Sequence, residues 1–267
     1  MTVTLGMDVS RYQDPARLDY AARYAGGARF CFVKASQAVP DPAAREHLER
    51  AAAAGLLCGL YHFVEPQVPA RQQIDLFLST AARLPHWRMV ALDVETTGGL
   101  PPAALSEALR ALADGLKAAL GTPALNRLVI YTRRGFLDAY CPQAWSWLPW
   151  FDLWLAQYPY AGPVLNLSWE ELHARWWPNA ELGPSRRAGF GWKFWQFQGG
   201  RFVLPGYPGG VDLDLFNGSE EELRAYAWTG PERLAAPQEP AGGGAQPSVE
   251  QRLEDHERRL AALEALH

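Results

Sequence analysis

Two acidic side chains, Asp93 and Glu95, follow directly after an apolar run in the stretch M-V-A-L-D-V-E-T-T at 89–97. Apolar residues without a helical period indicate a strand buried on both faces, the kind found in parallel sheets. Side chains alternate along a strand, so the two carboxylates point the same way, roughly 6–7 Å apart. Burying such a pair is costly unless it is used, and paired carboxylates suit acid–base chemistry. The alternative is a pair of turn acids, which Thr96 and Thr97 would also suit.

Strands and helices alternate around this stretch, which implies parallel strands joined by right-handed crossovers. Strands are predicted at 3–7, 30–33, 57–63, 90–94 and 128–131, and helices at 14–24, 42–54, 69–83, 102–120 and 136–140. Asp14 is the expected N-cap of the first helix. Strands at 153–156, 193–197 and 211–215 then follow without clear helices between them; an insert at 158–192 holds a helical piece at 168–176. The predicted fold is α/β, a modified TIM-like barrel of five β/α units closed by three further strands.

Polar side chains gather where these strands end, and barrels of this kind carry their sites at the C-terminal ends of the strands. The residues at these positions are Asp8, Lys34, His62, Asp93, Glu95, Tyr131, Gln157, Gln196 and Asp212.

Composition bounds the class of protein. The 267 residues allow one catalytic domain at 1–230 followed by a tail, and a net charge of −4 gives no reason to expect nucleic acid as a partner. Cys31, Cys58 and Cys141 have neither disulfide nor metal-ligand spacing. No His, Cys or carboxylate cluster has the spacing of a metal site, and no metal or cofactor is expected. No apolar run approaches the length of a membrane span. The N-terminus lacks the features of a signal peptide, which predicts synthesis in the cytoplasm without export by that route.

Eight short motifs occur in one order along residues 3–219. They are G-M-D-V-S-R-Y-Q at 6–13, F-V-K-A-S-Q at 32–37, A-G-L-L-C-G-L-Y-H-F at 54–63, A-L-D-V-E at 91–95, I-Y-T at 130–132, L-W-L-A-Q-Y at 153–158, F-W-Q-F at 194–197 and V-D-L-D-L-F-N-G at 211–218. In this set the chain resembles glycoside hydrolase family 25, the Chalaropsis-type lysozymes with which phages and bacteria cut peptidoglycan. It departs from the family's pattern at Ala38-Val39-Pro40, where a glycine usually follows the position of Gln37.

The resemblance implies the same barrel and a muramidase that cleaves the β-1,4 bond from N-acetylmuramic acid to N-acetylglucosamine. It implies that Glu95 is the general acid, and that an ionised Asp93 orients the 2-acetamido group of the substrate during attack on the anomeric carbon. Asp8 and Asp212 would complete the acidic cluster. Asp214 is a rival for the role of Asp212, because it lies two residues on and faces the same side. Whether the acetamido group or water attacks stays open.

Six further residues near strand ends are expected to line the substrate cleft: Lys34, Tyr61, His62, Tyr131, Gln157 and Trp195. Lys34 would hold an acidic partner, and Tyr61 would stack on a sugar or hydrogen-bond to its acetamido group. His62 has an alternative as a hydrogen-bonded core histidine. Trp145, Trp147 and Trp150 suit packing as well as a glycan platform.

The alternative function from another class is a catalytically silent glycan-binding or virion structural module on the same barrel. The presence of all four acids argues against it. With peptidoglycan as its partner, the enzyme would act on the cell wall, as a phage endolysin or a virion-associated lysozyme.

The tail divides into two parts. A Pro-, Ala- and Gly-rich stretch at 231–248 is typical of a flexible linker. In 249–267, Val249, Leu253, His256, Leu260 and Leu263 fall at alternating spacings of four and three, which predicts a short coiled-coil-like helix. We expect it to form a parallel homodimer or homotrimer, or else to remain a solitary amphipathic helix.

Overall fold

Eight strands form a closed barrel in the computed structural model of the protein, which describes residues 2–121, 127–158, 191–199 and 210–227. Each strand pairs with the next in chain order, and the last pairs with the first. They are β1 (Thr4–Val9), β2 (Ala28–Ser36), β3 (Leu57–Phe63), β4 (Trp87–Asp93), β5 (Val129–Arg133), β6 (Asp152–Ala156), β7 (Phe194–Gln198) and β8 (Asp212–Phe216). The predicted fold class is confirmed.

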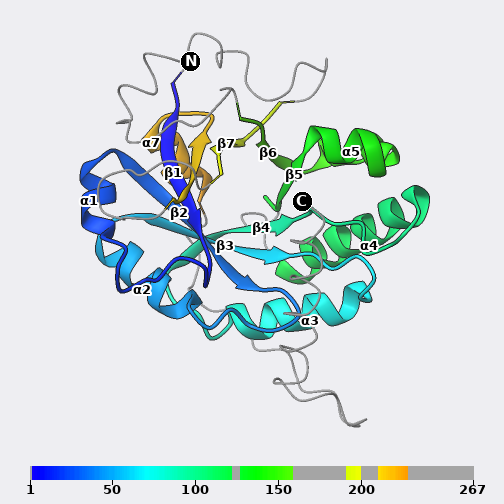
Figure 1. Ribbon diagram of the computed structural model, residues 1–267, viewed down its shortest axis with the longest axis horizontal. Coiled ribbons are helices and arrows are strands. Elements are labelled where there is room, and N and C mark those ends of the chain that lie inside the picture. The colour runs from blue at the N-terminus through cyan, green and yellow to red at the C-terminus, as the bar shows by residue number, and fades with distance from the viewer. Residues whose placement is uncertain (1, 122–126, 159–190, 200–209, 228–267) are drawn as a thin grey trace.

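Helices lie on the outside of the strands and follow one another around the barrel (Figure 1). They are α1 (Tyr20–Ala25), α2 (Ala44–Ala53), α3 (Ala70–Ala81), α4 (Pro102–Leu120), α5 (Arg134–Tyr140) and, after the last strand, α7 (Glu220–Tyr226). Two 3₁₀ helices, η1 (Pro142–Ser146) and η2 (Leu148–Trp150), connect α5 to β6. None of the described helices is both long and apolar enough to cross a membrane.

Helix α4 shows how the sequence pattern becomes structure. Its leucines recur every three or four residues, so they lie on one face, and that face is buried: Leu105, Leu109, Leu112, Leu116 and Leu120. Gly121 then ends the helix with a φ of 66°, a backbone conformation that favours glycine.

The first helix is shorter than predicted, because Asp14 does not cap it. The Asp14 carboxylate accepts a hydrogen bond from the amide of Ala16 at 2.9 Å, and its carbonyl accepts one from Leu18 at 3.2 Å, which closes a separate turn. Asp19 is the N-cap of α1 and accepts from the amide of Ala22 at 2.9 Å. The other predicted strands and helices in the described residues agree within three residues at either end. The predicted helical piece at 168–176 lies outside the described residues.

The last strand runs opposite to its neighbours. Strands β1 to β7 pair in parallel, whereas β8 is antiparallel to both β7 and β1. The mouth of the barrel therefore combines the C-terminal ends of seven strands with the N-terminal end of β8. The register places Asp212, the first residue of β8, directly opposite Asp8 of β1.

Aromatic rings fill the barrel below this mouth. Phe32 stacks on Trp154 with ring centroids 4.6 Å apart, and Phe194 meets Phe32 edge to face at 5.2 Å. Small residues make room for them: a Cβ on Gly59 would lie 2.5 Å from the Phe32 ring. The interior is therefore packed, and the space for a ligand lies at the mouth.

Candidate active site

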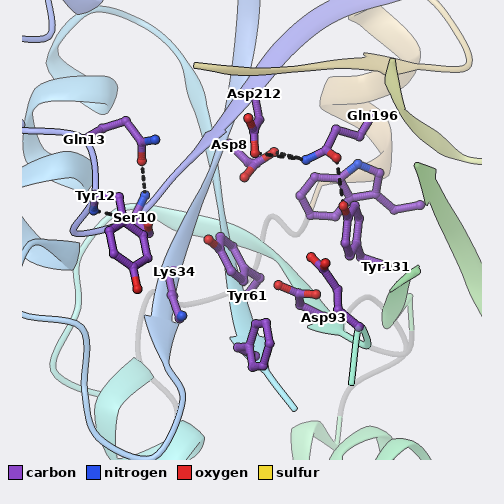
Figure 2. Close-up of a pocket in the computed structure, with 13 residues that line it drawn as sticks. Asp8, Ser10, Tyr12, Gln13, Lys34, Tyr61, Asp93, Tyr131, Gln196 and Asp212 are labelled. Carbon is purple, nitrogen blue, oxygen red and sulfur yellow. Dashed lines mark hydrogen bonds between the residues drawn. The ribbon is translucent and has the colours of Figure 1, made fainter. Parts of the chain in front are cut away.

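A cavity of about 190 Å³ opens at the mouth of the barrel. Its walls carry four carboxylates, one amine, two amides and several aromatic rings (Figure 2). The lining residues are Asp8, Ser10, Tyr12, Gln13, Lys34, Tyr61, Phe63, Asp93, Glu95, Tyr131, Trp154, Gln196 and Asp212. The structure thus brings together all four predicted acids with Lys34, Tyr61 and Tyr131.

Strand β4 delivers the two central carboxylates. Asp93 is its last residue and is 7% exposed, whereas Glu95 lies just beyond the strand with a side chain that is 34% exposed. A carboxylate oxygen of Glu95 lies 4.0 Å from a guanidinium nitrogen of Arg133. Glu95 is therefore the member of the pair that a ligand entering from solvent meets first.

Burial raises the pKa of Asp93 well above its usual range, the nearby Glu95 raises it further, and Lys34 opposes the rise. Burial also raises the pKa of Glu95, but Arg133 and the hydrogen bond from Asp93 both counteract the rise. Burial thus raises the pKa of both carboxyls, which are hydrogen-bonded to each other and can share a proton.

Lys34 faces these carboxylates from the end of β2. Its ammonium group donates a hydrogen bond to Gln37 Oε1 at 2.6 Å and lies 4.8 Å from the centre of the Phe63 ring. Gln37 in turn donates a hydrogen bond to Glu65 at 3.0 Å, which fixes the amide whose oxygen accepts from Lys34. Burial lowers the pKa of Lys34, and the charge of Asp93 opposes that change. Among the residues lining the cavity, Lys34 is the cation available to balance the acids.

The antiparallel pairing of β1 and β8 forms a second acidic group. Asp8 and Asp212 lie opposite each other, and both accept from the amide nitrogen of Gln196, at 2.8 and 3.3 Å. Asp214 lies deeper, fully buried, and accepts from the indole N–H of Trp154 at 2.8 Å. Burial and the adjacent Asp214 raise the pKa of Asp8 well above its usual range. Of the two rivals on β8, Asp212 lines the cavity and Asp214 supports it from below.

Three of the predicted substrate-binding residues lie outside the cavity lining. His62 is buried behind it, with Nδ1 2.9 Å from Ser36 Oγ and Nε2 3.1 Å from Gln73 Oε1, and burial lowers its pKa to about 4. Trp195 is 1% exposed and packs between the barrel and its outer layer. Its indole N–H donates to the backbone carbonyl of Gln157 at 2.7 Å, and the Gln157 side chain is turned to solvent.

Of the three tryptophans in and between η1 and η2, two are buried and one is exposed. Trp145 and Trp147 are buried against the outer core, whereas Trp150 is 58% exposed and lies under the Arg110 guanidinium, 4.7 Å from ring centre to cation. None of the three lines the cavity.

Several lining residues were not among the predicted catalytic and substrate-binding residues, although Gln196 was expected at a strand end near the site. They are Ser10, Tyr12, Gln13, Phe63, Trp154 and Gln196. On β7 the inward residue is Gln196 and its neighbour Trp195 faces outward, because side chains alternate along a strand; the apolar residues on both faces do not say which of the two points inward. Ser10, Tyr12 and Gln13 lie on a loop, where no periodicity predicts the direction of a side chain, and Phe63 is the last residue of β3.

Within the described part of the chain, no group of three or more His, Cys, Asp or Glu side chains has an arrangement suited to a metal ion. Asp8 and Asp212 instead accept from the amide of Gln196, and burial raises the pKa of Asp8, Asp93 and Glu95, which is the environment of carboxyls that exchange protons.

Comparisons with known proteins give the cavity a family context. The sequence profile that matches residues 7–203 is that of glycosyl hydrolases family 25. The uncharacterized protein YegX of Escherichia coli O157:H7 is 29% identical over 228 residues, which cover 83% of this chain and 72% of YegX. An N,O-diacetylmuramidase of Arthroderma benhamiae is 25% identical over 236 residues, covering 83% of this chain and 86% of that protein.

Among solved structures, a bacterial lysozyme from Streptomyces coelicolor superposes with a TM-score of 0.64 at 24% sequence identity. The match covers 85% of this chain and 98% of the lysozyme, which shows a shared fold. Because the family profile spans most of the chain, including β1 with Asp8 and β4 with its two acids, the protein belongs to family 25 of the glycosyl hydrolases and is a glycosidase.

Proposed function

We propose that the protein is a peptidoglycan hydrolase, a muramidase that cleaves the β-1,4 bond between N-acetylmuramic acid and N-acetylglucosamine. The observation that carries the proposal is the pair Asp93 and Glu95 at the mouth of a closed barrel, one buried and one open to solvent. Glycoside cleavage needs a proton donor for the leaving oxygen and stabilisation of a positive anomeric centre. The two environments suit these two tasks.

Glu95 is the general acid in this mechanism, because it is the carboxyl that a glycosidic oxygen can reach. The substrate itself moves the proton to it. When the N–H of the 2-acetamido group donates to Asp93, that hydrogen bond stabilises the ionised form of Asp93 and favours transfer of the shared proton to Glu95. Glu95 then protonates the leaving oxygen, while either the acetamido oxygen or water attacks the anomeric carbon.

The remaining lining residues have supporting roles. Lys34 limits the negative charge of the cavity, and Asp8 and Asp212 form the opposite wall. The rings of Tyr61 and Trp154 provide flat apolar surfaces for a sugar face. We propose that His62, Gln157 and Trp195 do not contact the sugar, because all three lie outside the cavity lining.

The test is wall clearing by the wild type and by Glu95→Gln. Loss of the acid should slow release of muropeptides by on the order of 10²–10⁴-fold, the usual contribution of general acid catalysis. The matched control is Glu107→Gln on the exposed face of α4, which should clear walls like the wild type. Equal release by wild type and Glu95→Gln would overturn the assignment.

The bond is identified from the products. Borohydride reduction of the released fragments should convert muramic acid, the new reducing end, to its alcohol. Reduced glucosamine in its place would contradict the proposed bond. A protein that binds walls without releasing fragments would be the silent module instead.

A further inference from the structure

Gln196 lies at the junction of the two halves of the site. It is 3% exposed and projects from β7 into the cavity wall. Its amide nitrogen donates to Asp8 at 2.8 Å and to Asp212 at 3.3 Å. Its amide oxygen accepts from the hydroxyls of Tyr131 at 2.8 Å and Tyr158 at 3.0 Å. Figure 2 shows this chain of bonds from the two aspartates through the amide to Tyr131.

These four contacts use the full hydrogen-bonding capacity of a glutamine side chain, two donors and two acceptors. The carboxylates on one side and the phenols on the other also fix which end of the amide faces which wall. A side chain so completely engaged cannot rotate without leaving buried groups unpaired, which is unfavourable.

Tyr131 has a second potential partner for its single hydroxyl hydrogen, Glu95, which lines the same cavity and whose pKa a hydrogen bond from this phenol lowers. A phenol that donates to Glu95 favours the ionised carboxylate, and a phenol that donates elsewhere can accept from protonated Glu95. The hydrogen of Tyr131 is committed to Gln196. While its hydrogen is donated to Gln196, the phenol can offer Glu95 only a lone pair.

We propose that Gln196 is a positioning residue for the general acid: by accepting the hydrogen of Tyr131, it leaves the phenol oxygen free to accept from Glu95 in its protonated form. Its two N–H groups brace the amide against Asp8 and Asp212, so that the oxygen stays turned to Tyr131. The inference rests on the proposed function of Glu95.

Other charged groups around Glu95 bear on the same proton. They are Asp93 on β4, Lys34 on β2, Arg133 beside Tyr131 on β5, and Asp8 on β1. Substitution of Gln196 keeps all of them, and Tyr131 is the group whose hydrogen it releases. A comparison with and without the Tyr131 hydroxyl therefore isolates the route through the phenol.

The experiment is the pH dependence of kcat/KM on wall fragments for the wild type, Gln196→Met and Gln196→Met/Tyr131→Phe. In Gln196→Met the phenol hydrogen becomes free to donate to Glu95, so the alkaline limb of the profile should move about one pH unit toward acid, since a bond to a charged group is worth about 1.5 kcal/mol. In the Tyr131→Phe background, the same substitution should leave the limb where Tyr131→Phe alone puts it.

Thermal unfolding checks that each variant is folded, and Gln196→Asn, which draws the carbonyl back by one methylene, replaces Gln196→Met if that variant does not fold. Tyr158→Phe removes the other phenol from the same oxygen and should leave the limb in place. The role of Gln196 would be overturned if Gln196→Met left the alkaline limb of the profile unmoved, or if it shifted the limb equally with and without the Tyr131 hydroxyl. In either case an inactive Glu95→Gln would still support the proposed function. Full activity of Glu95→Gln would overturn both.

Discussion

Single side chains in this protein are governed by where the barrel buries them. Burial raises the pKa of both Asp93 and Glu95, although the Glu95 side chain is the more exposed of the two. Asp214 is fully buried and has become the acceptor for the Trp154 indole. His62, a residue that ordinarily titrates near neutrality, is enclosed with two neutral partners. The same principle, that burial disfavours charge, sets the behaviour of all of them.

His62 leads to a prediction on stability. Burial lowers its pKa from 6.5 to about 4 in the folded protein. The unfolded chain therefore binds the proton first, and the contribution of neutral His62 to stability is complete above about pH 6.5 and is lost as pH falls toward about 4. Between about pH 7 and about pH 5, the wild type should lose about 2 kcal/mol more than His62→Gln.

Denaturant unfolding at the two pH values measures this difference. Burial raises the pKa of Asp8, Asp93 and Asp214, which stabilises the fold as pH falls, but these groups are common to both proteins and cancel in the comparison. Parallel stability curves for the two proteins would show that His62 is not held neutral.

Side chains that face each other on neighbouring strands of the barrel are complementary in size. The rings of β2 lie over glycines of both neighbouring strands: Phe30 is in register with Gly6 of β1, and Phe32 with Gly59 of β3. A large side chain and a glycine thus share each space in the interior. The pairing lets a barrel with a ring-filled core close around the site.

A pair of alanine substitutions tests this matching. Gly59→Ala places a Cβ 2.5 Å from the Phe32 ring and 3.2 Å from Met89 Cβ, so overpacking should destabilise the fold by about 1–3 kcal/mol. Gly135→Ala in α5 meets no atom within 4 Å and should stabilise by about 0.5–1 kcal/mol, because alanine loses less backbone entropy in a helix. Chemical denaturation of both variants measures the change in the free energy of unfolding. An unchanged stability of Gly59→Ala would contradict the packing argument.

The site combines residues from the first and the last strand of the barrel, which are far apart in the sequence. Closure of the sheet by β8 brings Asp212 against Asp8, and Gln196 then links both to the Tyr131 side of the cavity. The predicted linker at 231–248 and helix at 249–267 lie outside the described residues. We propose that the helix joins two or three barrels in parallel, which would raise avidity for a polymeric wall without a new contact to it.

Light scattering on the full chain and on a chain ending at residue 230 tests the assembly. The full chain should have two or three times the mass of one chain at tens of micromolar, and the shortened chain should be monomeric, because the heptad positions are then absent. Since His256 occupies a core position, acidification should weaken the association by charging it. A monomeric full-length protein would rule the proposal out.

Much of the protein was readable from its sequence, because the relevant rules are local. The leucine spacing of 102–120 predicted α4 to the residue, and the period of a strand placed Asp93 and Glu95 on one side before any fold was known. The order of strands and helices was enough to predict a barrel of five β/α units and three further strands.

Only the tertiary structure decided which way the remaining side chains face. Strands of such a barrel are apolar on both faces, so the sequence lacks the alternation that would have shown Gln196 pointing inward and Trp195 outward. The direction of β8 likewise depends on its partners, and it set Asp212 rather than Asp214 at the mouth. The raised pKa of Asp93 depends on burial by residues far apart in the chain, because desolvation is a property of the folded surroundings and not of the motif.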